Sequence, residues 1–118
     1  MNWDYYRHKN FIGEIAQMSS FITQWRISKG FHTPHGFDTE KERDQMLGKL
    51  MLIVSEVSEA SEAVRKDDMF EFREEIADTF IRLFDICGSV GLNIGMDIIG
   101  KMQINEERPQ KHGKECSL

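Results

Sequence analysis

The sequence has few of the residues that mark disulfide-bonded or membrane-spanning proteins. Only two cysteines, Cys87 and Cys116, and two prolines, Pro34 and Pro109, occur among its 118 residues. Two cysteines without a CxxC pair do not make a disulfide framework, which favours a reducing compartment. No apolar run approaches the roughly 20 residues that cross a bilayer, and the first ten residues, MNWDYYRHKN, contain no apolar signal core. We therefore expect a cytoplasmic protein that does not enter a membrane.

An excess of positive charge is also absent. Fifteen Lys and Arg against 20 Asp and Glu give a formal net charge of -5. Affinity for a nucleic-acid backbone grows with the number of phosphates that basic side chains neutralise, so this acidic chain is a poor nucleic-acid binder. A small phosphorylated ligand remains compatible with the charge, because a metal ion can bridge acidic side chains to phosphate.

Alternation of β-branched and polar residues is missing as well, so no strand is predicted. The pattern that is present is apolar spacing at steps of three and four, which predicts helices. The expected helices are residues 8–28, a second that Thr39 caps and that runs to about Lys66, a third that Asp67 or Asp68 caps, and a fourth over 94–107. Their apolar stripes are Phe11, Ile15, Met18, Ile22 and Trp25 in the first, Leu47, Leu50, Val54, Val57, Ser61 and Val64 in the second, and Phe72, Ile76, Phe80, Leu83 and Cys87 in the third.

These segments predict an all-α bundle of about four helices in a single domain, residues 1–118. Short connections make neighbouring helices antiparallel. Residues 1–9 and 110–118 are expected to be flexible ends.

Two of the expected helices carry paired acids. Glu56 and Glu59 are three residues apart, as are Glu75 and Asp78, and this spacing places each pair on nearly one helical face. If the two helices pack antiparallel, the carboxylates converge across the groove between them. Such a cluster repels itself unless water or a cation neutralises it. Hard oxygen ligands without nearby His or Cys point to Mg²⁺, with Mn²⁺ as a substitute, rather than to zinc.

The acidic pairs have other interpretations. Asp and Glu are abundant in this chain, so a non-catalytic helical interaction module with solvated or partner-facing acids remains open. A di-iron carboxylate bundle is disfavoured because it needs Glu-x-x-His pairs. The four histidines, His8, His32, His35 and His112, lie outside both acidic pairs.

Three segments in order resemble the MazG-like, all-α nucleotide pyrophosphohydrolases. They are SEVSEASEAVR, EEIADTFIRLFDICGSVGLNI and KMQINEERPQKHGK, and the resemblance covers roughly residues 20 to 114. It implies a helical bundle completed by oligomerisation, as a homodimer or homotetramer. It also implies Mg²⁺-dependent hydrolysis of nucleoside triphosphates, often deoxy or non-standard ones, to the monophosphate and pyrophosphate, as in nucleotide-pool house-cleaning. A different phosphorylated metabolite as substrate remains an alternative.

The resemblance also implies roles for particular residues. The metal ligands are Glu56, Glu59, Glu75 and Asp78, and the substrate contacts are Lys101, Asn105, Arg108 and, for stacking on the base, Trp25. Glu56 is our choice of catalytic general base, and the basic tail residues Lys111, His112 and Lys114 suit a phosphate-facing lid. Many family members have Glu-Glu-x-x-Glu, whereas Ser55 stands here in place of the first acid. One bound metal ion is therefore the expectation.

Overall fold

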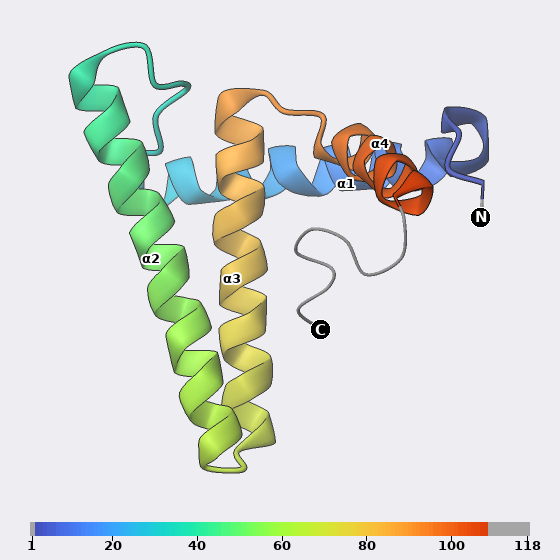
Figure 1. The fold of residues 1–118 in the computed structure, drawn as a ribbon. Helices are drawn as coiled ribbons and strands as arrows, with labels where there is room; N and C mark the ends of the chain where they lie inside the picture. The colour runs from blue at the N-terminus through green and yellow to red at the C-terminus, as the bar shows by residue number, and fades with distance from the viewer. Residues whose placement is uncertain (1, 109–118) are drawn as a thin grey trace. The chain divides into compact units, whose positions relative to one another are not determined.

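The computed structural model describes residues 2–108, and in this range the chain forms four α-helices and no strand. The helices are α1 (Tyr5–Ser28), α2 (Glu40–Arg65), α3 (Met69–Val90) and α4 (Ile94–Glu107) (Figure 1). The predicted all-α class is confirmed. Residues 5–9, part of an expected flexible end, are helical, because α1 begins three residues before its predicted start. The other expected flexible end, 110–118, lies outside the described residues.

Polar side chains fix the starts of the two long central helices. Thr39 forms a capping box with Glu42 at the start of α2: Thr39 Oγ1 accepts from the Glu42 backbone N–H at 3.1 Å, and Glu42 Oε1 accepts from the Thr39 backbone N–H at 3.1 Å. Asp68, one of the two predicted caps, accepts from the Glu71 backbone N–H at 3.0 Å. Gly91 ends α3 with a φ of 82°, a left-handed conformation that strains any residue with a Cβ.

The described residues group into two compact units. One contains the chain up to Ala16 and from Asn93 onward, and the other contains residues 17–92, which hold the end of α1 together with α2 and α3. Each unit brings two helices together at a glycine. A Cβ at Gly95 would lie 3.0 Å from Ile12 Cα, and a Cβ at Gly88 would lie 2.7 Å from the Ser19 carbonyl oxygen. Both approaches therefore need a residue without a side chain.

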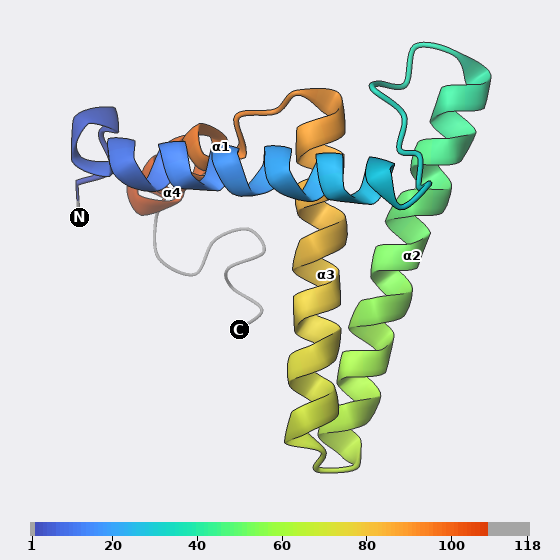
Figure 2. The same ribbon diagram turned by 180° about the vertical axis from the view of Figure 1, so that it is seen from behind.

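Helices α2 and α3 lie side by side and run antiparallel, as both ribbon views show (Figures 1 and 2). A short turn joins them, in which Asp67 adopts a φ of 55°, a conformation that Asp tolerates better than most residues. The buried residues of α2 are Met46, Ile53, Ala60 and Ala63. They share one face of the helix, and the two alanines allow α3 to approach closely.

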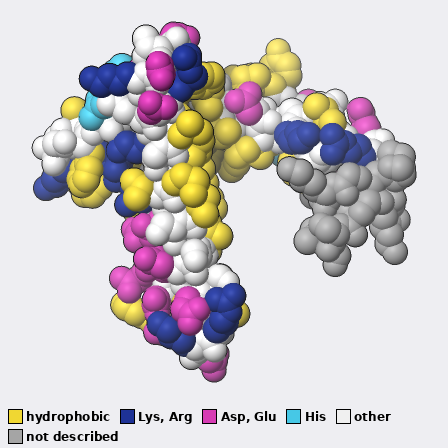
Figure 3. Space-filling view, turned by 60° about the vertical axis from the view of Figure 1, so that its left-hand side comes forward, with side chains coloured by type: hydrophobic (Ala, Val, Ile, Leu, Met, Phe, Trp, Pro, Cys, Tyr) yellow, Lys and Arg dark blue, Asp and Glu magenta, His cyan; other side chains and the backbone are white. Residues whose placement is uncertain are grey.

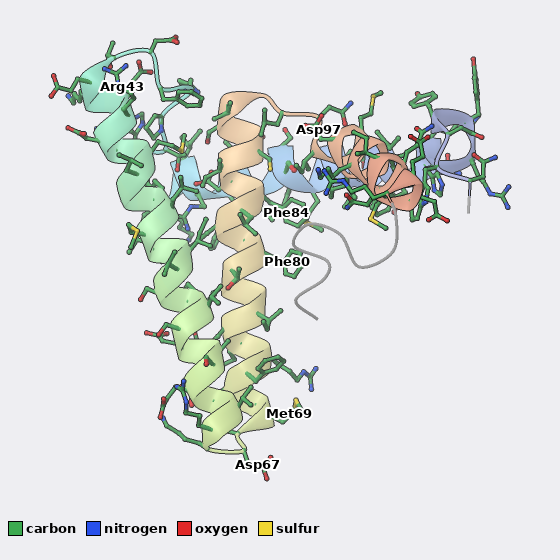
Figure 4. The ribbon with its side chains drawn as sticks, in the orientation of Figure 1. Arg43, Asp67, Met69, Phe80, Phe84 and Asp97 are labelled. Carbon is green, nitrogen blue, oxygen red and sulfur yellow. The ribbon has the colours of Figure 1, made fainter. Side chains whose placement is uncertain are left out.

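The apolar stripe predicted for α2 is largely exposed in this chain. Leu47 is 60% exposed and Val54 is 54% exposed. By helical spacing the stripe lies beside the buried face of α2 rather than on it. In α3, Phe80 and Phe84 project from the side that faces away from α2 (Figure 4), with ring centroids 6.1 Å apart.

No single helix in the described part of the chain is long and apolar enough to be a membrane span. Helices α3 and α4, counted together across the break between them, have the length and apolar composition of a span.

Candidate metal centre

Three of the four predicted metal ligands come together between α2 and α3. Glu56, Glu75 and Asp78 each offer a carboxylate oxygen, and these oxygens all lie within 4.8 Å of one another. Glu56 and Glu75 are half-buried, whereas Asp78 is exposed. The space-filling view shows Asp and Glu side chains gathered over the half of the α2–α3 pair nearer to the joining turn (Figure 3). The antiparallel pairing and the three-residue spacing on α3 produce this convergence.

Glu75 is the acid that its neighbours perturb most. Hydrogen bonding with Glu56, burial, and then the hydrogen bond and charge of Glu59 raise the pKa of Glu75 to about 8. Two carboxyl groups share a hydrogen bond only when one of them is protonated. When Glu75 carries no proton, its Oε2 atom has no hydrogen-bond partner among the described residues, and solvent does not reach it. This oxygen therefore needs a proton or a cation.

Glu59 is exposed and lies outside the triad. Its carboxyl group is nevertheless close enough to Glu75 to contribute to the raised pKa of that residue. The fourth predicted ligand is therefore at the edge of the cluster rather than inside it.

Arg82 places a positive charge directly beside the acids. Its Nε atom lies 3.4 Å from Glu56 Oε1, and both side chains are largely shielded from solvent. Arg82 continues the acidic face of α3, since it lies four residues after Asp78. The Arg82 charge offsets part of the negative charge of the cluster at Glu56.

The predicted substrate residues of α4 belong to the other unit. Lys101 lies on α4 and Arg108 is its C-cap, and both are exposed. Asn105 is half-buried, and its Oδ1 atom is shielded from solvent and has no partner among the described residues. Trp25, in α1, is 46% exposed. The substrate roles of these four residues remain predictions, and the expected lid residues 111–114 lie outside the described range.

A buried polar cluster that sequence reasoning did not find lies near the acids. Asp85 accepts hydrogen bonds from Arg26 Nε at 3.0 Å, from Thr33 Oγ1 at 2.6 Å and from Ser89 Oγ at 3.4 Å. The Arg26 guanidinium also lies 4.5 Å from the centre of the Phe31 ring. Helical spacing puts Asp85 on the same face of α3 as Glu75 and Asp78, but no local pattern pairs it with a residue 59 positions away.

Comparisons of the chain with family models, with curated proteins and with solved structures give no match.

Proposed function

We propose that this chain is a Mg²⁺-dependent pyrophosphohydrolase that converts nucleoside triphosphates, including deoxy forms, to the monophosphate and pyrophosphate. The observation that carries the proposal is the convergence of Glu56, Glu75 and Asp78 within 4.8 Å, from two helices. Three oxygen ligands without His or Cys fit a hard cation. When Glu75 is deprotonated, its shielded Oε2 atom has no partner among the described residues, which is a further reason to place a cation there.

Bound Mg²⁺ would offset negative charge on the phosphates and on the departing pyrophosphate. The chain's own part is to hold the cation with the three acids and to remove a proton from the attacking water. Glu56 remains our predicted general base, with one carboxylate oxygen toward the cation and the other toward the attacking water. Glu59 is the neighbouring carboxylate outside the triad. If Glu56 is the general base, Glu56→Gln should lower turnover more than Glu59→Gln does.

The proposal includes a homodimer or homotetramer. Large apolar side chains are exposed along α1, α2 and α3, and no large side chain is fully buried among the described residues. Contiguous exposed apolar surface of this kind is typical of protein–protein contacts. A second copy of the chain is the partner that we propose to cover it.

The decisive experiment measures pyrophosphate release from a panel of ribo- and deoxyribonucleoside triphosphates, with Mg²⁺ and with EDTA. We expect release only with Mg²⁺, together with a monophosphate product. Asp78→Asn should lower turnover by about 100-fold or more, which corresponds to about 2.7 kcal/mol of activation free energy. Its helical circular dichroism should be unchanged, because it removes charge repulsion and no packing.

Glu74→Gln is the matched control. Glu74 is an exposed acid on the same helix and lies outside the triad, so its removal should leave turnover within about twofold of wild type. Wild-type turnover in Asp78→Asn would contradict the site. If a folded wild-type protein released pyrophosphate from no triphosphate, the proposed reaction would be wrong, and a non-catalytic module or another phosphorylated substrate would be favoured.

A further inference from the structure

A hollow of about 380 Å³ lies in the same unit as the acidic triad. Its lining residues are His32, Gln45, Gly48, Lys49 and Leu52. All except His32 belong to α2. Lys49 precedes Glu56 by seven residues, which is two helical turns, so the two side chains lie on one face of α2, about 10 Å apart along its axis. The hollow is thus next to the triad along the helix.

The charge along this face changes from negative to positive. Lys49 is half-buried and forms no ion pair with any of the described residues. Burial lowers the pKa of Lys49, and the charges of Arg26 and Arg82 lower it further, while Asp85 opposes them. Lys49 also shares a small cavity with Arg82 and Asp85. A half-buried ammonium group that forms no ion pair with the described residues, set beside the arginine that contacts Glu56, is suited to receive a phosphate.

The wall of the hollow formed by His32 is held in place by its neighbours. Thr33 donates to Asp85 Oδ2 at 2.6 Å, and His35 Nδ1 lies 3.1 Å from the Ser89 carbonyl oxygen. Both bonds join the segment before α2 to α3. The loop is therefore anchored on either side of Pro34, so the hollow is formed before any ligand arrives.

Gly48 leaves the hollow open at the backbone of α2. A Cβ added at this position would meet no atom within 4 Å. A glycine inside a helix costs about 1 kcal/mol relative to alanine, and no neighbouring side chain or backbone requires it here. Its effect is to leave space.

We propose that this hollow receives the nucleoside part of the substrate. Lys49 binds the phosphate that joins the nucleoside to the metal-bound phosphates. The inference rests on the proposed function. The volume lies within the range of small-molecule sites. His32 and Gln45 offer hydrogen-bond donors and acceptors for a base or sugar, and Leu52 offers an apolar contact. The distance of two helical turns from Glu56 leaves room for the phosphates between the metal and the nucleoside.

The test compares nucleotides with inorganic tripolyphosphate, which has phosphates but no nucleoside. Gly48→Leu places a branched side chain in the hollow, and Lys49→Met removes the charge. Gly48→Leu should raise the KM for every deoxyribonucleoside triphosphate by about tenfold or more (about 1.4 kcal/mol), and should change the inhibition constant of tripolyphosphate by less than about twofold. Lys49→Met should raise both the nucleotide KM and the tripolyphosphate inhibition constant by about tenfold.

Two controls match these variants. Gly13→Leu adds the same side chain at an exposed helical glycine that also has no atom within 4 Å of an added Cβ. Lys41→Met removes an exposed lysine from the same helix, α2. Both controls should keep the wild-type nucleotide KM and tripolyphosphate inhibition constant. The two test variants and the two controls should all retain wild-type helical circular dichroism.

The outcomes separate this inference from the proposed reaction. Turnover with unchanged nucleotide KM in Gly48→Leu would overturn the inference and leave the reaction intact. If the wild type binds nucleotide calorimetrically in Mg²⁺ without hydrolysing it, and Gly48→Leu loses that binding while tripolyphosphate still binds, the inference stands and the reaction is wrong. A wild type that neither hydrolyses nor binds nucleotides would overturn both.

Discussion

At the scale of single residues, Glu75 links the acidic cluster to pH. Its pKa is raised from about 4.5 to about 8 by Glu56, by burial and by Glu59. Between these two values the folded chain holds a proton that the unfolded chain has released, so unfolding becomes easier as pH rises. The contribution of Glu75 to stability is full below its unfolded pKa and is lost as pH rises through its folded pKa.

We therefore predict that the melting temperature of the metal-free protein falls between pH 5 and pH 8. In Glu75→Gln this fall should be smaller, because the amide does not titrate. Thermal unfolding in EDTA, followed by circular dichroism across that pH range, measures the effect. Glu74→Gln, the exposed control on the same helix, should retain the wild-type slope. Equal slopes in Glu75→Gln and the wild type would show that Glu75 does not titrate in this window.

The residue scale also shows what the sequence could predict of the site. Glu75 and Asp78 share a face because helical geometry is local, so the printed sequence was enough to predict it. Lys49 could have been found by the same reasoning, since it lies two turns before Glu56. The pairing of Arg26 with Asp85 could not, because it depends on how α1 packs against α3.

At the scale of helices and loops, Asp85 joins three segments of the chain: the end of α1, the loop before α2, and α3. The Arg26–Asp85 ion pair is almost fully buried, with side-chain exposures of 10% and 6%. Removing one partner of a buried pair leaves the other charge without compensation and costs about 3–5 kcal/mol. We predict that Asp85→Asn lowers the free energy of unfolding by this amount. Urea unfolding at a fixed protein concentration measures it.

The exposed Arg65–Glu62 ion pair provides the control for this prediction. Its side chains are 68% and 51% exposed, and pairs of this kind contribute about 0–1 kcal/mol. Glu62→Gln should therefore change the free energy of unfolding by less than about 1 kcal/mol. If Asp85→Asn were no more destabilising than Glu62→Gln, Asp85 would not hold these segments together.

The helices themselves were more predictable than the faces that they bury. The Thr39 capping box, the Asp68 cap and Gly91 act on their immediate neighbours, so the limits of α2 and α3 could be read from short stretches. Apolar spacing shows which face of a helix needs cover but does not say what covers it. In α2 the predicted stripe borders the buried face, which holds Ala60 and Ala63, but does not coincide with it.

At the scale of the whole molecule, the exposed stripe of α2 is the surface that the proposed second copy would cover. Leu47, Leu50, Met51, Val54 and Val57 are all exposed, and their spacing places them on one side of the helix. The other side carries Lys49 and Glu56, the residues of the proposed substrate site. A second copy can therefore cover the stripe without covering the face of α2 that carries the site.

We predict that Val54→Glu weakens self-association, because a charge in an apolar interface is not compensated there. The dissociation constant should rise by about 100-fold or more, which corresponds to about 2.7 kcal/mol. Sedimentation velocity over a range of protein concentrations measures it, and Lys41→Glu, which adds a carboxylate on the same helix away from the stripe, should associate like the wild type. A monomeric wild type, or a Val54→Glu variant with wild-type association, would show that a second copy does not cover this face. The triad would remain possible in either case, because all three of its acids come from one chain.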